Sequence, residues 1–316
     1  MRRLTILALL LLTPTVTHAQ DEPPPPPQTS SLTVNVRVVA IDTVVRDRHG
    51  DPVLNLTKDD FTLREDSKPI NIRYFSHDDN LPLTVGLLID TSGSQHEFFS
   101  DEALAADLFL TNTLTHPQDR AFIALFDSTV QLLQPMTPHI SELRKGLRLL
   151  QYHTDPAFAL NGGGTLLFDA IAKVSSTTIE HEPGRRALVI LTDGDDNGSR
   201  ATREEAIRQA QLNDVSIYSV LYTNEDPHYP QAANLRPSGI AVMHSISQAT
   251  GGRDFLVGKG TSIADIFAAI AQDLRNQYRL GITPTASKPG KYHSLSLKPQ
   301  DKSLTVQSRA GYYTPQ

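Results

Sequence analysis

The chain has 316 residues, with 29 Lys and Arg against 35 Asp and Glu, so its formal net charge is −6. An apolar fraction of 39% supports a buried core and argues against a disordered chain. The acidic balance, without any basic stripe, excludes the electrostatic footprint of a nucleic-acid-binding protein.

Residues 1–19 have the pattern of a secretory signal peptide. Arg2 and Arg3 precede the apolar run 4–12, and small residues at positions 17 and 19 favour cleavage after Ala19. An uncleaved anchor or a buried strand is the alternative, although the run is about half as long as a bilayer span requires. The sequence has no cysteine, which excludes both disulfides and a lipid-anchored cysteine. We therefore expect a secreted or periplasmic protein.

The next segments predict a linker and a small all-β unit. Residues 20–31 include five consecutive prolines and favour an extended spacer. From Leu32 to Ala40 apolar residues alternate with mostly polar ones, which predicts a half-buried strand. Residues 61–64 and 70–74 alternate again, so 32–80 is expected to form an N-terminal β segment.

Residues 81–276 show strands that alternate with helices, a pattern typical of a parallel sheet covered by helices on both faces. No part of this region is apolar enough to cross a membrane. The expected strands are 83–89, 121–126, 130–133, 187–191, 215–221 and 255–257, and the expected helices are 97–114, 140–150, 165–178, 202–212, 242–250 and 263–275.

The tail, 277–316, returns to the alternation of strands at 278–282, 292–297 and 304–308. Neither end of the chain alone offers enough strands for a good core, and the termini of a domain often lie close together. The fold class we expect is therefore α/β, with a doubly wound, mostly parallel sheet at 81–276 inserted in a small β-sandwich. The two flanks, 32–80 and 277–316, would build that sandwich.

The most informative motif is Asp90-Thr91-Ser92-Gly93-Ser94, which follows the apolar strand 83–89. Asp90 offers a charged oxygen, and Ser92 and Ser94 offer neutral hydroxyls. Hard cations such as Mg²⁺ prefer oxygen ligands of this kind. Taken alone, Asp90 could equally be the N-cap of a helix.

Two further loops are expected at the same edge of the sheet, because ligands of open α/β sheets bind at the carboxyl ends of the strands. One is the glycine-rich loop 161–165, in which Thr165 adds a hydroxyl. The other is 192–194, where Asp193 adds a second carboxylate. Hydroxyls and carboxylates suit Mg²⁺ better than Zn²⁺, which prefers nitrogen and sulfur.

These three motifs resemble the von Willebrand factor type A domain over residues 82–276. That resemblance implies a metal-ion-dependent adhesion site that holds Mg²⁺, Mn²⁺ or Ca²⁺. It further implies that the hydroxyls of Ser92, Ser94 and Thr165 contact the ion directly or through water. Asp90 and Asp193 would act mainly through water. The remaining coordination position would take a carboxylate from a partner protein.

The flanks resemble a bacterial subgroup of this family, the secreted type A-related proteins of acidobacteria. The similarity rests on residues 44–50, 56–61 and 65–66 before the central region, and on 277–281 and 309–313 after it. Insertion of the type A domain in a β-sandwich is also similar to the arrangement of integrin β chains, an analogy of fold alone.

A formal EF-hand match begins at Asp193, but an apolar strand precedes it where an EF-hand needs a helix. Thr202 with Glu205 predicts a helix-capping box there instead. Asp195 and Asp196 are expected to be solvated turn residues, with a second Ca²⁺ site as the alternative. Residues 224–240 predict a long surface loop.

We expect no catalytic residues, since the sequence offers neither a cysteine nucleophile nor a nucleophile elbow. The function that follows is divalent-metal-dependent protein binding, as in adhesion or scaffolding. Two alternatives stay open: a metal-assisted hydrolase that uses Asp90 and Asp193, and a structural envelope protein whose metal stabilises the fold. The sequence leaves the oligomeric state undetermined.

Overall fold

The computed structural model describes residues 38–77, 81–92, 99–150, 164–222, 237–258, 260–285 and 288–314. The expected signal peptide and Pro-rich linker lie outside these residues. So do Ser94 and most of the glycine-rich loop. All described residues belong to one compact unit that begins at position 37.

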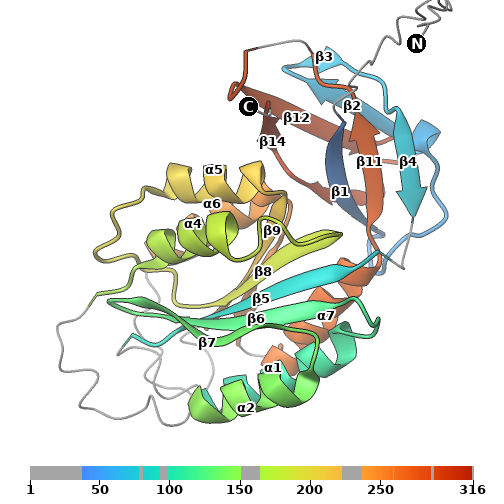
Figure 1. Ribbon diagram of the computed structural model, residues 1–316. Coiled ribbons are helices and arrows are strands. Elements are labelled where there is room, and N and C mark those ends of the chain that lie inside the picture. The colour runs from blue at the N-terminus through green and yellow to red at the C-terminus, as the bar shows by residue number, and fades with distance from the viewer. Residues whose placement is uncertain are drawn as a thin grey trace, which may run out of the picture. The chain divides into compact units, whose positions relative to one another are not determined.

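A six-stranded sheet forms the centre of the α/β part (Figure 1). The strand order is β10-β9-β8-β5-β6-β7, and every neighbouring pair is parallel except β6 with β7. The strands are β5 (Leu83–Asp90), β6 (Arg120–Phe126), β7 (Val130–Thr137), β8 (Arg185–Leu191), β9 (Val215–Tyr222) and β10 (Asp254–Val257).

Helices cover both faces of this sheet (Figure 1), and each face has its own apolar core. One core lies under α1 (Phe99–Thr113), α2 (Ile140–Leu150) and α7 (Ile263–Arg275). The other lies under α4 (Leu167–Thr177), α5 (Arg203–Leu212) and α6 (Pro237–Thr250).

The central strand β5 has the burial expected of a strand in a parallel sheet that helices cover on both faces. All eight of its residues are buried, as expected for a strand with helices on both faces. At Gly86 an added Cβ would lie 2.3 Å from the Phe122 ring, so glycine leaves the space over the sheet that this ring fills. The predicted fold class is confirmed: the α/β part is a mostly parallel, doubly wound sheet.

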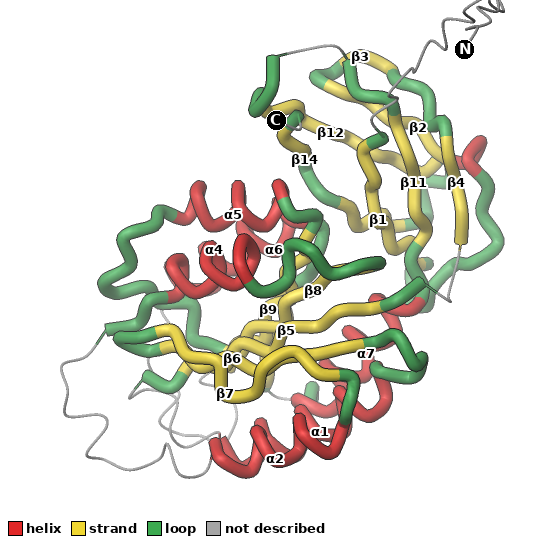
Figure 2. The backbone as a smooth tube through the Cα atoms, in the orientation of Figure 1, coloured by secondary structure: helices red, strands yellow, loops and turns green. Residues whose placement is uncertain are grey.

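Two further sheets, both antiparallel, combine strands from the two flanks. Their orders are β13-β1-β11-β4 and β14-β12-β2-β3. All of these strands except β13 are labelled in Figure 2. A shared apolar core that includes Ile41, Leu63 and Tyr278 joins the flanks. The strands are β1 (Val39–Arg46), β2 (Phe61–Glu65), β3 (Lys68–Pro69), β4 (Tyr74–His77), β11 (Tyr278–Ile282), β12 (Tyr292–Pro299), β13 (Thr305–Ser308) and β14 (Gly311–Tyr313), and a short 3-10 helix, η1 (Lys58–Asp60), precedes β2.

The structure corrects three element boundaries. The strand expected at 70–74 is wrong, because residues 70–73 carry the chain from β3 in one antiparallel sheet to β4 in the other. The strand expected at 32–40 continues to Arg46, and its first residues lie outside the described ones. The loop expected at 224–240 ends earlier, because α6 begins at Pro237, a residue that the first turn of a helix tolerates.

Within the described ranges, no helix combines the length and the apolar character that a membrane crossing needs.

Candidate metal centre

Asp90 is the last residue of β5 and is almost completely buried, with 1% of its surface exposed. Its hydrogen-bond donors are neutral. The Ser92 amide donates to Oδ1 at 3.0 Å, and the Thr192 hydroxyl donates to Oδ2 at 2.7 Å. The Ser92 hydroxyl bonds to the same carboxylate. These neutral donors stabilise the carboxylate but add no positive charge beside it.

Burial raises the pKa of Asp90 to about 7. The hydrogen bonds from Ser92 and Thr192 lower this pKa, and the nearby negative charge of Asp193 raises it. Asp193 therefore lies close enough to oppose the ionisation of Asp90. A bound cation would relieve both the desolvation and the repulsion.

Asp193 follows β8, and its side chain is largely buried. The turn that holds it is tight: Thr192 Oγ1 accepts the Gly194 amide at 3.0 Å, and Asp193 Oδ1 accepts the Asp195 amide at 3.1 Å. Gly194 has a positive φ of 81° and packs against the backbone of Gly239 at the start of α6. A side chain at Gly194 would collide there, so glycine is required.

Thr165 is buried and joins the loop of Asp193 through backbone pairing. Its amide donates to Asn197 O and its carbonyl accepts from Asn197 N, both at 2.9 Å. Gly164 lies beside the same Asn197 carbonyl, where a Cβ would come within 3.1 Å. This pairing fixes the amino end of α4 against the loop after β8.

The structure thus brings Asp90, Ser92 and Asp193 together. It places Thr165 on a loop at the same edge of the sheet, where β5 and β8 end and α4 begins (Figure 2). Ser94, the fifth predicted ligand, lies outside the described residues. These placements leave the ligand roles as a proposal.

Sequence reasoning missed the part that Thr192 plays. It is fully buried, and its hydroxyl joins Asp90 to the Asp193 turn, as donor to one and acceptor from the other. Because Thr192 and Asp90 are 102 positions apart, only the register of β5 beside β8 brings them together. A threonine at the end of a strand next to the Asp90 strand is the one signal that was available.

Asp196 also has a specific role that the sequence did not indicate. Its Oδ1 accepts the Phe168 amide at 3.1 Å and the Ser199 hydroxyl at 2.5 Å, so it links the first turn of α4 to the loop after β8. The predicted capping box is half present: Thr202 accepts the Glu205 amide, while the Glu205 carboxylate accepts from Gln209 and Arg208.

The donor set fits a hard cation. Among the described residues, no group of three or more His, Cys, Asp and Glu side chains could hold a metal. A metal at this edge would therefore depend on Asp90 and Asp193 together with the hydroxyls of Ser92 and Thr165. Such an all-oxygen set suits Mg²⁺, Mn²⁺ or Ca²⁺ better than a metal that needs nitrogen or sulfur.

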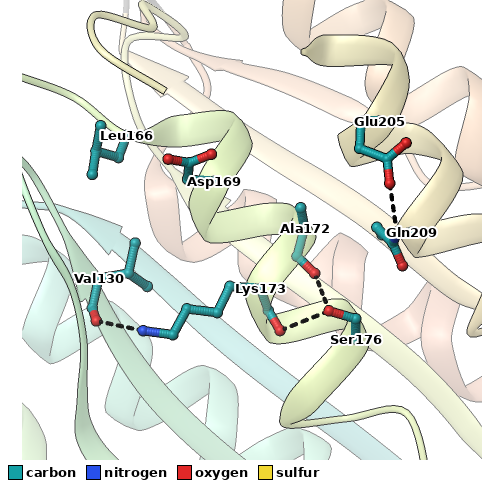
Figure 3. A pocket seen from close by; sticks show the side chains of 8 residues that line it. All are labelled: Val130, Leu166, Asp169, Ala172, Lys173, Ser176, Glu205 and Gln209. Carbon is teal, nitrogen blue, oxygen red and sulfur yellow. Dashed lines mark hydrogen bonds between the residues drawn. The ribbon is translucent and has the colours of Figure 1, made fainter. Parts of the chain in front are cut away.

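A shallow groove begins beside Thr165, at Leu166, and runs between β7, α4 and α5 (Figure 3). Its polar groups already have hydrogen-bond partners. Lys173 donates to the Val130 carbonyl, and Ser176 donates to the Ala172 carbonyl (Figure 3). The groove therefore does not present a cluster of side chains with an evident chemistry.

A family model described as the von Willebrand factor type A domain matches residues 85–195. No curated protein matches the chain. Solved structures are similar at low identity. The conserved hypothetical protein BatB from Bacteroides thetaiotaomicron is 15% identical, with 61% of this chain and 97% of that chain covered and a TM-score of 0.46.

Two other similar structures have names that describe their biology. The type V pili tip protein Mfa5 from Porphyromonas gingivalis has 11% identity, 61% and 94% coverage and a TM-score of 0.44. Proximal thread matrix protein 1 from the mussel byssus, with a zinc-occupied metal-ion-dependent adhesion site, has 12% identity and a TM-score of 0.45. The match covers 62% of this chain and 48% of that one.

The family match begins within β5, spans all three predicted metal loops and ends two residues after Asp193. The matched segment contains most of β5 and all of β6, β7 and β8, four strands of the doubly wound sheet. Residues 85–195 therefore have the sequence pattern of a von Willebrand factor type A domain.

Proposed function

We propose that this protein binds a partner protein through a divalent metal ion, Mg²⁺ or Mn²⁺, held at the carboxyl end of the central sheet. The observation that carries the proposal is the environment of Asp90. It is a buried carboxylate with neutral hydrogen-bond donors and a second carboxylate, Asp193, close enough to raise its pKa. Such a pair is costly to bury without a cation.

The proposed ligands are Ser92, Ser94 and Thr165 through their hydroxyls, and Asp90 and Asp193 mainly through water. Thr192 and the Ser92 amide orient the Asp90 carboxylate, because they bond to its two different oxygens. The Asn197 pairing holds Thr165 against the loop of Asp193.

When bound, the ion would supply a coordination position for a carboxylate from outside the chain. Three of the five proposed ligands are neutral hydroxyls, so the protein leaves much of the ion's charge for that partner group. A glutamate or aspartate on the surface of another protein is the matching chemistry. This is capture without turnover, and none of the proposed residues needs to transfer a proton.

We also propose that the protein acts in the periplasm or outside the cell. The support is the sequence pattern of residues 1–19, with cleavage after Ala19, followed by the Pro-rich spacer. The flanking motifs favour placement among the secreted type A-related proteins of acidobacteria.

A pull-down from envelope and culture proteins tests the proposal, with full-length protein in Mg²⁺ or in chelator. We expect one set of partners in Mg²⁺ that is lost in chelator and lost with Asp90→Ala or Ser94→Ala. Asp51→Ala, an exposed carboxylate in a turn after β1, is the matched control and should bind as wild type does. Unchanged binding of Asp90→Ala in chelator would overturn the proposal.

The hydrolase alternative is measured on the same samples. Turnover of a phosphoester by wild type, lost in Asp193→Ala, would replace the binding function with a metal-assisted hydrolysis. If Mg²⁺ raises the unfolding temperature but no partner depends on it, the metal has a structural role. We expect metal-dependent capture and no turnover.

A further inference from the structure

The end of β6 lies between two of the predicted metal loops. Phe126 O accepts the Thr91 amide at 2.9 Å, and the next carbonyl, Asp127 O, accepts the Leu166 amide at 2.8 Å. Thr91 directly follows Asp90, and Leu166 directly follows Thr165. Two consecutive carbonyls therefore hold the residues next to two proposed ligands.

The Asp127 side chain fixes the direction of these carbonyls. Its Oδ1 accepts the Thr129 amide at 2.8 Å and lies within 3.3 Å of the Ser128 hydroxyl, while the Asp127 amide donates to Thr129 O at 3.0 Å. This side-chain turn closes the hairpin between β6 and β7. The other oxygen, Oδ2, faces the Thr91 hydroxyl at 3.3 Å.

The loops at this edge thus form a closed ring of contacts. Asp127 connects the loop of Asp90 to the loop of Thr165. The Asn197 pairing connects Thr165 to the loop after β8, and the Thr192 hydroxyl returns to Asp90. Removal of one member would loosen the geometry of the others.

We propose that Asp127 is a positioning residue of the metal centre, which sets the loops of Asp90 and Thr165 at one spacing without touching the ion. The inference rests on the proposed function, since it needs a metal to position for. Both carboxylate oxygens of Asp127 already accept hydrogen bonds, which favours a bracing role over a ligand role. Groups that hydrogen-bond metal ligands directly typically contribute 10- to 100-fold in metal affinity. Asp127 contacts residues next to the ligands, so we expect an effect at the lower end of that range.

Two substitutions separate geometry from charge. Asp127→Asn keeps a side-chain oxygen at the same reach for the Thr129 amide but removes the charge. Asp127→Glu keeps the charge but extends the side chain by one methylene group, so the short turn cannot close in the same way. If Asp127→Glu does not fold, Asp127→Ala replaces it, with the same expected loss.

The experiment measures Mn²⁺ affinity by calorimetry, together with hydrogen exchange of the Leu166 and Thr91 amides in the metal-free protein. We expect Asp127→Asn to bind within about threefold of wild type and Asp127→Glu to bind about tenfold or more weakly. Amide exchange should be faster in Asp127→Glu and unchanged in Asp127→Asn.

Any other pattern overturns the inference: a loss in Asp127→Asn would indicate a role of the charge, and wild-type affinity and exchange in both variants would indicate no role. Failure of the proposed function has a different signature. In that case wild type itself does not bind Mn²⁺, while the exchange data still report whether Asp127 braces the loops.

Discussion

The two ends of strand β5 lie in different electrostatic environments. At its amino end, the Leu83 amide donates to Asp119, a fully buried carboxylate that forms an ion pair with Arg275 of α7. At its carboxyl end, the equally buried Asp90 receives hydrogen bonds from the Ser92 amide and hydroxyl and from Thr192, and it lies near a second acid. The chain supplies a cation at one end and a set of oxygens at the other.

The comparison distinguishes a buried carboxylate that stabilises the fold from one that is available to bind a metal ion. A buried carboxylate paired with arginine needs nothing from outside, and removal of one partner leaves the other charge stranded. A buried carboxylate beside another acid has no such partner within the pair, and a bound cation would stabilise its charged form. Stability should therefore depend on Asp119, and metal binding on Asp90.

The largest effect is expected from Asp119→Ala. It removes the partner of Arg275 and the acceptor for the amides of Leu83 and His116. We expect a loss of about 3–5 kcal/mol in the free energy of unfolding, measured in urea with chelator present. The exposed-site control Asp51→Ala should change this free energy little, and a loss below about 1 kcal/mol for Asp119→Ala would remove the contrast between the two ends.

Asp90→Asn should change the free energy of unfolding of the metal-free protein in the opposite direction, towards higher stability. An amide keeps an acceptor for Thr192 or the Ser92 amide and removes a buried charge from beside Asp193. We expect unfolding free energy in chelator to rise by about 1–3 kcal/mol. With Mg²⁺ present, wild type should gain stability and the variant should not. A variant that is less stable than wild type in chelator would show that Asp90 is a structural carboxylate like Asp119.

The smallest change in stability is expected from Asp196→Ala. This variant tests whether Asp196 only links two loops at this end of the sheet or also binds a metal ion. The substitution removes the acceptor for the Phe168 amide and the Ser199 hydroxyl. We expect a loss of about 1 kcal/mol in stability and an unchanged number of bound Ca²⁺ ions per chain. If a second Ca²⁺ binds to wild type and is lost in the variant, Asp196 is a ligand and not a link between loops.

Sequence patterns predicted the parts of the candidate site that lie at the ends of apolar strands. Asp90 and Asp193 were predictable because a carboxylate directly follows a run of buried residues, and Thr165 because glycines precede it and a helix follows. Thr192, Asp127 and Asn197 were not, since their roles depend on which strands and loops become neighbours. The chain does not reveal locally that Thr192 will face a residue 102 positions away.

The same reason explains the error in the flanks. Alternation at 70–74 is typical of one strand, yet the chain changes sheets there, and the partner that decides this is β11, which lies about 200 positions further along the sequence. Fold class depends on the overall alternation of strands and helices, so it survives such local errors.

Direct titration of metal tests the central claim most simply. Calorimetry with Mn²⁺ should detect one ion per chain in wild type, lost in Asp90→Asn and retained in Asp119→Asn where that variant folds. Equal binding by wild type and Asp90→Asn, or no binding by wild type, would contradict the claim that the carboxyl end of β5 is built to receive a metal ion.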